Sequence, residues 1–311
     1  MTNPTTVSPL RQRMTEDMTA RGLGQQTQRG HIRACKRFAA YLKRSPETAT
    51  AEDVRLFQLH LMESGLTIQN RNRTMTGVRF LLRVTMRRLD LAAEIFHMKE
   101  PVRVPQILSA DEAKRLLLMA GRLQVRMLFS IGYGAGLRVS EVVKLKVKHI
   151  DSALGVIRVE QAKGKKDRQV MLSPETLDLL REWWKVRSKK YDHGVPLQER
   201  WLFPGRRKGL HLTPRQVTRL FHETVEAAGI RKKVTLHALR HSFATHLFDR
   251  GVDIRTIQAL LGHEKLETTA RYTRVATGLI TAVESPLDQL SLPDKAKRKR
   301  GKHKSDGETG T

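Results

Sequence analysis

The chain has 311 residues, of which 39% are hydrophobic and 29% are charged, which suits one large folded domain or two ordinary ones. Its 58 lysines and arginines outnumber its 31 acidic residues, and the resulting net charge of +27 favours a polyanionic partner such as nucleic acid. The single cysteine, Cys35, excludes an internal disulfide and a zinc site with more than one thiolate, and no apolar run reaches the length of a membrane span, so we expect a soluble protein.

The first hundred residues show only helical patterns. Apolar residues recur at helical spacing over 8–19 and 25–43, where Cys35 is predicted to be a small core residue. Thr50 with Asp53 is typical of the start of a third helix. A fourth helix is predicted over 67–89, and we interpret its arginines as phosphate contacts rather than as a solvated face. They are Arg71, Arg73, Arg79, Arg83, Arg87 and Arg88.

A different pattern follows the first hundred residues. Residues 97–106 include two prolines and show no periodicity, which is typical of an extended linker. A new helix is predicted from Ser109, with Glu112 completing its cap. The alternating segments 155–159 and 168–172 flank the polar turn AKGKKD, which predicts a β-hairpin.

Helices dominate the rest of the chain. Ser173 and Thr213 each precede a proline, which predicts the start of a helix at both places. Residues 291–311 carry seven basic and three acidic residues and are predicted to be a disordered basic tail. The sequence therefore predicts a mainly α fold with a small antiparallel β-sheet, of the α+β class.

The segment TLHALRHSFATHL, residues 235–247, is the most informative one. On a helix, His237 and Arg240 share a face. An apolar stripe lies on another side and consists of Leu236, Leu239, Phe243 and Leu247. The pair His237 and His241 also suggests a zinc site, but no third ligand is placed by a motif, so we expect no metal.

Further motifs occur on both sides of this segment. Upstream lies Gly136-Leu137-Arg138, and downstream lie Leu261-Gly262-His263 and then Tyr272. In chain order, Arg138, a lysine of the hairpin, His237, Arg240, His263 and Tyr272 form a specific set. This arrangement resembles the tyrosine recombinase, or phage-type integrase, family. The segments GAGLRVSEVVKL, HALRHSFATHL and LLGH are similar to the signature motifs of that family.

The resemblance covers about 107–287 and extends more loosely to the N-terminal helices. It implies a helical core-binding domain that clamps DNA (1–97), a linker (98–106), a catalytic domain (107–290) and the basic tail (291–311). It also implies a site-specific recombinase or integrase that acts as a homotetramer on two sites in double-stranded DNA, without a cofactor. Accessory DNA-bending proteins are further candidate partners, and the expected location is the cytoplasm, at the bacterial nucleoid. A helix over 277–290 would dock on a neighbouring protomer or pack on its own domain.

The chemistry of DNA cleavage requires residues of these types. A phosphodiester gathers negative charge on its non-bridging oxygens when a nucleophile approaches. The guanidinium groups of Arg138 and Arg240 can hold those oxygens through paired, charge-assisted hydrogen bonds. His237 and His263 can donate further bonds or exchange the proton of the tyrosine. Tyr272 is the candidate nucleophile, since a cationic cluster favours its phenolate form.

Two further roles come from the resemblance and from elimination. The family uses a hairpin lysine as the general acid for the departing 5′ oxygen, which implies Lys163, with Lys165 and Lys166 as alternatives. Glu141 is expected to orient hydrogen bonds beside Arg138. The remaining tyrosines do not follow the His263 motif, and they are Tyr41, Tyr133 and Tyr191.

Two other functions are compatible with parts of the pattern. A type IB topoisomerase uses a similar residue set but works as a monomer, and the arginine-rich N-terminal helix favours the recombinase. A non-catalytic DNA-binding protein would explain the charge but not the ordered set of six residues. Among recombinases, the motifs do not separate the integrases of phages and mobile elements from the Xer resolvases.

Overall fold

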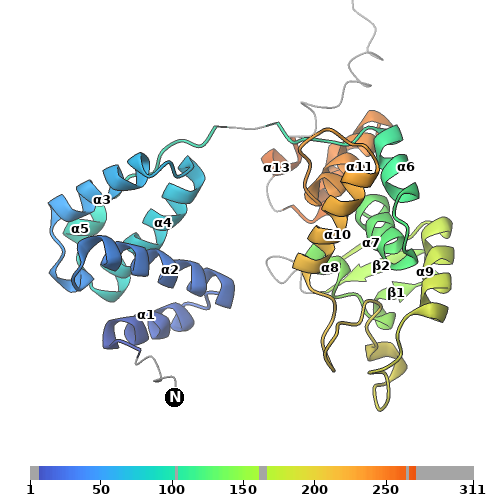
Figure 1. The fold of residues 1–311 in the computed structure, drawn as a ribbon, viewed down its shortest axis with the longest axis horizontal. Coiled ribbons are helices and arrows are strands. Elements are labelled where there is room, and N and C mark those ends of the chain that lie inside the picture. The colour runs from blue at the N-terminus through green and yellow to red at the C-terminus, as the bar shows by residue number, and fades with distance from the viewer. Residues whose placement is uncertain (1–6, 102–103, 161–166, 264–265, 271–311) are drawn as a thin grey trace, which may run out of the picture. The chain divides into compact units, whose positions relative to one another are not determined.

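A computed structural model describes residues 7–101, 104–160, 167–263 and 266–270. The chain divides into two compact units, Met1–Arg103 and Val104–Thr311 (Figure 1). Each unit buries a hydrophobic core of its own. Within the described ranges, no helix is long and apolar enough to cross a membrane.

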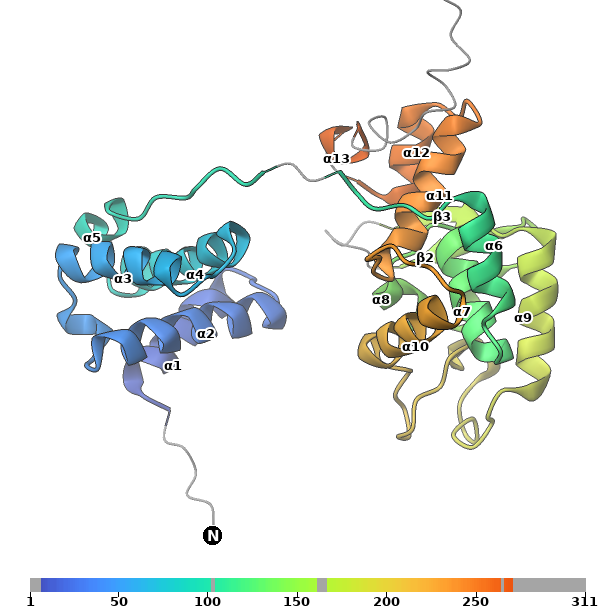
Figure 2. The ribbon, with the colours of Figure 1, turned by 45° about the horizontal axis from the view of Figure 1, so that its top comes forward.

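The N-terminal unit is helical. Its elements are α1 (Pro9–Ala20), α2 (Gln25–Leu42), the 3-10 turn η1 (Pro46–Thr48), α3 (Ala51–Glu63), α4 (Ile68–Phe80), the π-helical turn η2 (Leu81–Thr85) and α5 (Leu89–Ala93). Helices α2 and α4 pack against each other where a Cβ on Gly77 would lie only 2.7 Å from the Cβ of Ala34 (Figure 2). Phe38, Phe57 and Val78 are completely buried in the core beside this crossing. Small residues at the crossing therefore allow the close approach on which the core depends.

Most of the local predictions for this unit are confirmed. Thr50 and Asp53 form the predicted capping box at the start of α3. Cys35 is half-buried among apolar residues of α1 and α4, and burial raises the pKa of its thiol to about 12. A thiol with so high a pKa remains protonated at neutral pH, as expected of a packing residue.

The predicted fourth helix is wrong beyond residue 85. Helix α4 widens into the π-turn η2, where the amide of Met86 donates to the carbonyl of Leu81 at 2.9 Å. Arg87 then adopts a left-handed conformation with φ of 57°, which no continuous helix can accommodate. The chain thereby turns into α5, whose Leu91 and Ala92 are buried in the same core as Leu82.

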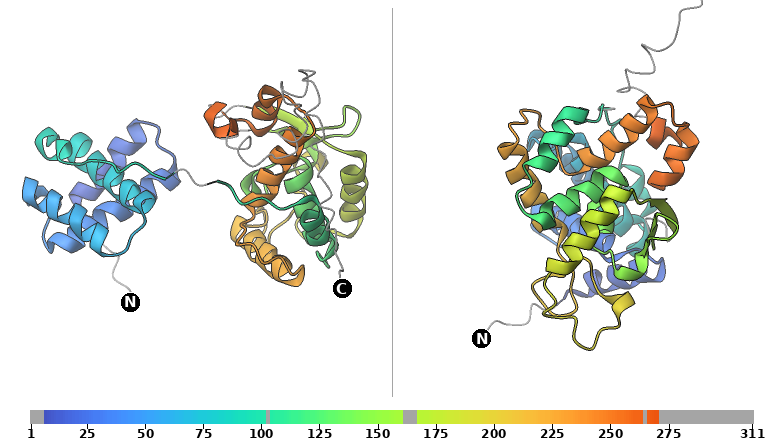
Figure 3. Two further views of the ribbon diagram at one scale, coloured as in Figure 1. Left: turned by 90° about the horizontal axis from the view of Figure 1, so that it is seen from above. Right: turned by 90° about the vertical axis from the view of Figure 1, so that its right-hand side faces the viewer.

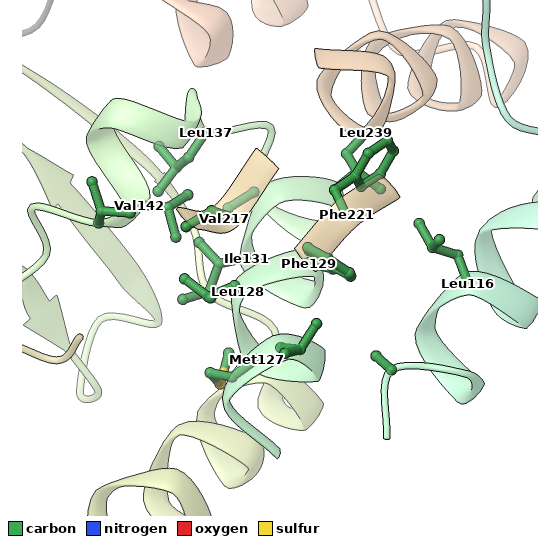
Figure 4. Packing of buried hydrophobic residues seen from close by; sticks show 14 of the residues in the cluster. Leu116, Met127, Leu128, Phe129, Ile131, Leu137, Val142, Val217, Phe221 and Leu239 are labelled. Atoms are coloured by element: carbon green, nitrogen blue, oxygen red, sulfur yellow. The ribbon is translucent and has the colours of Figure 1, made fainter. Parts of the chain in front are cut away.

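The C-terminal unit contains the remaining helices and the sheet. Its helices are α6 (Ala110–Leu118), α7 (Leu123–Gly134), α8 (Val139–Val142), α9 (Pro174–Val186), α10 (Pro214–Ala227), α11 (His237–Asp249), α12 (Ile254–Leu261) and α13 (Leu266–Ala270), with 3-10 turns η3 (Val147–His149) and η4 (Leu197–Glu199). Helix α7 is central and contacts α6, α8, α9, α10 and α11. Its Met127, Phe129 and Ile131 are completely buried, and Phe129 meets Phe221 of α10 edge to face (Figure 4).

The sheet has the strand order β1 (Ile150–Asp151), β2 (Val156–Val159) and β3 (Arg168–Met171), and its neighbouring strands are antiparallel. The predicted hairpin is therefore confirmed, with Val159 opposite Arg168 next to the turn. The short strand β1 was not predicted. The fold class expected from the sequence, mainly α with a small antiparallel sheet, is confirmed.

Helices α11 and α12 lie next to each other, and α12 also contacts β3 (Figure 2, Figure 3). Helix α11 connects two apolar clusters, because Leu239 packs against the core around α7 while Phe243 packs against Ile257 of α12. Of the predicted apolar stripe, Leu239 and Phe243 are buried, and Leu236 and Leu247 are partly buried. The polar side chain of Arg240 on α11 reaches the turn before α8 and the end of α12.

Candidate active site

The turn between α7 and α8 positions Arg138. Gly136 has a φ of 63°, and a Cβ there would lie 2.4 Å from the ring of Phe243, so both its conformation and its surroundings require glycine. Arg138 caps α8: its amide donates to Glu141 Oε2 at 2.9 Å, and its Nη1 donates to Oε1 at 2.8 Å. The Arg138 side chain is 22% exposed, so a ligand can still reach it.

Arg168 is a further cation of this site, and the sequence motifs did not single it out. It is the first residue of β3 and donates to both oxygens of Glu141, at 2.7 and 3.1 Å. Its Nε donates to the carbonyl oxygen of Leu260 at 2.9 Å. Only its place beside the predicted hairpin turn distinguished it, since its carboxylate partner lies 27 residues earlier in the chain.

The carboxylate of Glu141 is ionised in this arrangement. Burial alone would raise its pKa, but hydrogen bonds and charge from Arg168, together with the bonds from Arg138, lower the pKa to about 2. The prediction that Glu141 orients hydrogen bonds beside Arg138 agrees with these contacts.

Helix α11 provides Arg240, whose side chain is among the largest that the unit buries completely. It is 1% exposed, and its Nη1 donates to the carbonyl oxygen of Gly136 at 2.7 Å, while its Nη2 donates to that of Leu261. Arg240 therefore connects the turn before α8 with the end of α12. Its guanidinium group is held in a fixed orientation by the backbone.

His263 lies directly after α12. Gly262 ends that helix in the left-handed conformation, and a Cβ there would meet the side chain of Arg168 at 3.0 Å. His263 Nε2 lies 3.1 Å from Arg240 Nη2, and its Nδ1 lies 2.9 Å from Thr269 Oγ1. Since a guanidinium group only donates, Nε2 must accept, and the proton of the neutral ring is on Nδ1 and donated to Thr269.

The pKa values of both histidines reflect the positive charge around them. Burial, followed by the charges of Arg240 and Arg138, lowers the pKa of His263 to about 3. His237 remains exposed, yet the loss of surrounding water and then the charges of Arg240 and Arg138 lower its pKa as well. The structure therefore brings Arg138, His237, Arg240 and His263 into one cationic cluster, although they come from three separate segments.

Two predicted residues lie outside the described residues. Lys163, with its alternatives Lys165 and Lys166, belongs to the hairpin turn 161–166, and Tyr272 follows the last described residue of α13. The other tyrosines have contacts elsewhere. The hydroxyl of Tyr133 lies 2.8 Å from Nδ1 of His246, and that of Tyr191 donates to the carbonyl oxygen of Arg206 at 2.9 Å.

The rings of His237 and His241 meet edge to face, with centroids 4.9 Å apart. Over the described part of the chain, no group of three or more His, Cys, Asp or Glu side chains is arranged to hold a metal ion.

The N-terminal unit has a basic groove between α2 and α4. Three exposed arginines line it, Arg33 and Arg37 from α2 and Arg73 from α4, together with the polar side chains of Gln26 and Asn70. The arginines predicted on the fourth helix do not all face this groove. The Nη2 of Arg79 donates to the carbonyl oxygen of Ile95, and Arg88 is paired with Asp90.

Comparisons with known proteins agree with these features. The model of the phage integrase family matches residues 104–278, which is more than half of the chain, and that of the phage integrase N-terminal SAM-like domain matches residues 10–89. An integrase/recombinase of Sinorhizobium fredii is 40% identical over 289 residues, which cover 92% of this chain and 91% of the relative. Tyrosine recombinase XerA of Pyrococcus horikoshii is 35% identical over 231 residues, which cover 73% of this chain and 77% of the relative.

Solved structures show the same fold. XerH site-specific recombinase bound to palindromic difH substrate superimposes with a TM-score of 0.65 at 22% identity, over 90% of this chain and 85% of that chain. A lambda integrase dimer bound to a core site gives a TM-score of 0.65 at 19% identity, over 85% of this chain and 93% of that chain. From the family match and the identity to its relatives, the chain belongs to the phage integrase family of tyrosine recombinases.

Proposed function

We propose that this protein is a site-specific DNA recombinase that cleaves and rejoins DNA through a 3′-phosphotyrosine intermediate on Tyr272. The observation that carries this proposal is the cationic cluster of Arg138, His237, Arg240 and His263. Its guanidinium groups are already oriented, by Glu141 and by the carbonyl oxygens of Gly136 and Leu261. Preorganised donors of this kind stabilise charge that develops on a phosphate, because they need no reorientation during the reaction.

In the proposed reaction, Arg138 and Arg240 hold the non-bridging oxygens of the scissile phosphate. The phenolic oxygen of Tyr272 forms a bond to phosphorus, and the bond to the 5′ oxygen breaks. Lys163 gives a proton to that leaving oxygen. Neutral His237 can accept the proton of Tyr272, because its lowered pKa keeps it neutral at physiological pH. Attack by a 5′-hydroxyl on the phosphotyrosine reverses these steps and rejoins DNA.

Double-stranded DNA is the proposed partner. The net charge of +27 and the basic groove between α2 and α4 support it. XerH and lambda integrase, which share this fold, were solved bound to DNA. We propose that residues 1–97 clamp the duplex, that residues 107–290 carry out the chemistry, and that four protomers act on two sites. The predicted linker (98–106) and basic tail (291–311) remain parts of this proposal.

A nicked duplex that contains DNA flanking the native gene tests the proposal. The nick lets the short cleaved strand diffuse away, so that protein bound through tyrosine accumulates. Wild type, Tyr272→Phe and Tyr133→Phe are incubated with this substrate, and the products are separated in hot detergent. We expect covalent complexes with wild type and Tyr133→Phe, and none with Tyr272→Phe.

The same experiment can contradict the proposal. Covalent complexes that persist in Tyr272→Phe would show that another residue is the nucleophile. Binding of the flanking duplex in gel shifts without a covalent complex from wild type would favour a non-catalytic DNA-binding protein.

A further inference from the structure

Two arginines share the single carboxylate of Glu141, but they bind it in different ways. Arg168 binds both oxygens, Oε2 at 2.7 Å and Oε1 at 3.1 Å, whereas the Arg138 guanidinium contacts only Oε1, at 2.8 Å. A two-point contact between guanidinium and carboxylate is the stronger of the two geometries. Arg168 is therefore the principal counter-ion of Glu141.

The three side chains differ in their burial, and burial determines how strongly their charges interact. The side chains of Glu141 and Arg168 are 9% and 8% exposed, whereas that of Arg138 is 22% exposed. Charges removed from water interact strongly because little solvent screens them. If Arg168 were uncharged, Arg138 would be the cation left beside this carboxylate. Its charge would then be compensated within the protein and less available to a phosphate.

Arg168 also connects segments that are distant in sequence. Its Nε donates to the carbonyl oxygen of Leu260 at 2.9 Å, and its side chain packs against Gly262, directly before His263. The next carbonyl, that of Leu261, accepts from Arg240. One side chain of β3 thus contacts both the carboxylate beside Arg138 and the backbone that holds Arg240 and His263.

We infer that Arg168 is a positioning residue for DNA cleavage, which neutralises Glu141 so that Arg138 keeps its positive charge and its orientation for the scissile phosphate. This inference rests on the proposed function, in which Arg138 binds that phosphate. Within the described residues, Arg168 donates to Glu141 and to the carbonyl oxygen of Leu260. Its effect is transmitted through Glu141.

The test measures single-turnover formation of the covalent complex on the nicked duplex at saturating protein, with DNA affinity and melting temperature measured in parallel. Arg168→Met keeps the length of the side chain without its charge, and Arg168→Lys keeps the charge. Arg158→Met is the matched control, because Arg158 lies on the neighbouring strand β2 and its side chain is 51% exposed. We expect Arg168→Met to slow cleavage about tenfold to a hundredfold with nearly unchanged affinity, by analogy with the groups that orient metal-binding side chains.

Rescue distinguishes a role of charge from a role of packing. Arg168→Lys should recover most of the lost rate, and Arg158→Met should cleave like wild type. In a Glu141→Gln background there is no carboxylate to neutralise, so adding Arg168→Met should change the rate by less than about threefold. The double variant removes both buried charges, the carboxylate of residue 141 and the guanidinium group of residue 168. The double variant can therefore still be compared with Glu141→Gln even if Arg168→Met alone does not fold.

Several outcomes would overturn the inference. Cleavage by Arg168→Met at the wild-type rate, or an equal loss in Arg158→Met, would show that Arg168 has no specific role. A tenfold loss from Arg168→Met that persists in the Glu141→Gln background would indicate packing instead of charge. Absence of a covalent complex from wild type would contradict the proposed function and the inference together, whereas normal wild-type cleavage with an unaffected Arg168→Met contradicts the inference alone.

Discussion

Arg240 shows how a buried charge can be kept in a fixed orientation. A guanidinium group that is 1% exposed needs hydrogen-bond acceptors, and the carbonyl oxygens of Gly136 and Leu261 provide them. These acceptors are neutral, so the positive charge of Arg240 is not cancelled by them. The charge acts on His263, whose ring is kept neutral beside it. A guanidinium group that backbone carbonyl oxygens hold in one orientation is suited to an anionic ligand.

Replacing this guanidinium group with an ammonium group tests the importance of its geometry. Arg240→Lys keeps the charge but cannot reach both carbonyl oxygens in the same way. We expect single-turnover cleavage to slow by about a hundredfold to a thousandfold, while DNA affinity in gel shifts changes little. Arg250→Lys, an exposed position at the end of the same helix, serves as the control. Cleavage by Arg240→Lys within about threefold of wild type would contradict the role given to Arg240.

The lowered pKa of His263 leads us to expect that the stability of the protein depends on pH. This pKa is about 3 in the folded protein, and in the unfolded chain it is near 6.5, the ordinary value for histidine. Below pH 6.5 the unfolded chain therefore binds a proton that the folded chain does not. The folded state consequently becomes less stable as the pH decreases. Between pH 7 and pH 5 this contributes a loss of up to about 2 kcal/mol. In urea denaturation, His263→Gln should lose less stability than wild type over this interval, whereas the exposed His193→Gln should behave like wild type.

At the scale of the elements, the turn before α8 leads us to expect that two glycines differ in how much stability their replacement costs. Gly136 and Gly155 both have a φ of 63°, but a Cβ on Gly136 would overlap the ring of Phe243, whereas the nearest atom to one on Gly155 is 3.8 Å away. Gly155→Ala should cost about 1–2 kcal/mol for the left-handed conformation. Gly136→Ala should cost about 1–3 kcal/mol more from overpacking. Equal losses in the free energy of unfolding would show that Phe243 moves aside without strain.

The elements that were predictable from the sequence depend on short-range signals. The capping boxes at Ser109 and Thr213 involve partners three residues away, and both are present in the structure. The end of the fourth helix was not predictable, because Arg87 carries no pattern that requires a left-handed conformation. It adopts one so that α5 can bury Leu91. Strand β1 has only two residues, too few to show alternation.

The candidate site was predictable in its residue types but not in its internal contacts. The motifs identified Arg138, His237, Arg240 and His263 as members of one set. Their partners are distant in sequence: Arg240 binds a carbonyl group 104 residues away, and Arg168 binds one 92 residues away. No periodicity relates such positions, so the contribution of Arg168 becomes visible only once the chain is folded.

At the scale of the whole molecule, the net charge of +27 predicts DNA binding that weakens steeply with salt. Each phosphate contact by a basic side chain contributes about 0.9 to the slope of log affinity against log salt. Arg73→Gln, in the groove between α2 and α4, should therefore reduce the slope by about 1. The matched control is Arg55→Gln, since Arg55 is paired with Glu52 on α3. Equal slopes for wild type and Arg73→Gln would place the phosphate contacts elsewhere.

The long-range bonds around α11 also determine when a growing chain acquires its reactive centre. A ribosome releases the N-terminal unit first, and that unit has a complete core of its own. The contacts that fix α11 instead join residues far apart in synthesis, such as the bond from the Leu108 amide to Ser242, which spans 134 positions. Arg240 acquires its second carbonyl acceptor and its histidine partner only after residues 261 and 263 have been added. A nascent chain can thus contain a folded N-terminal unit well before it can break a DNA strand.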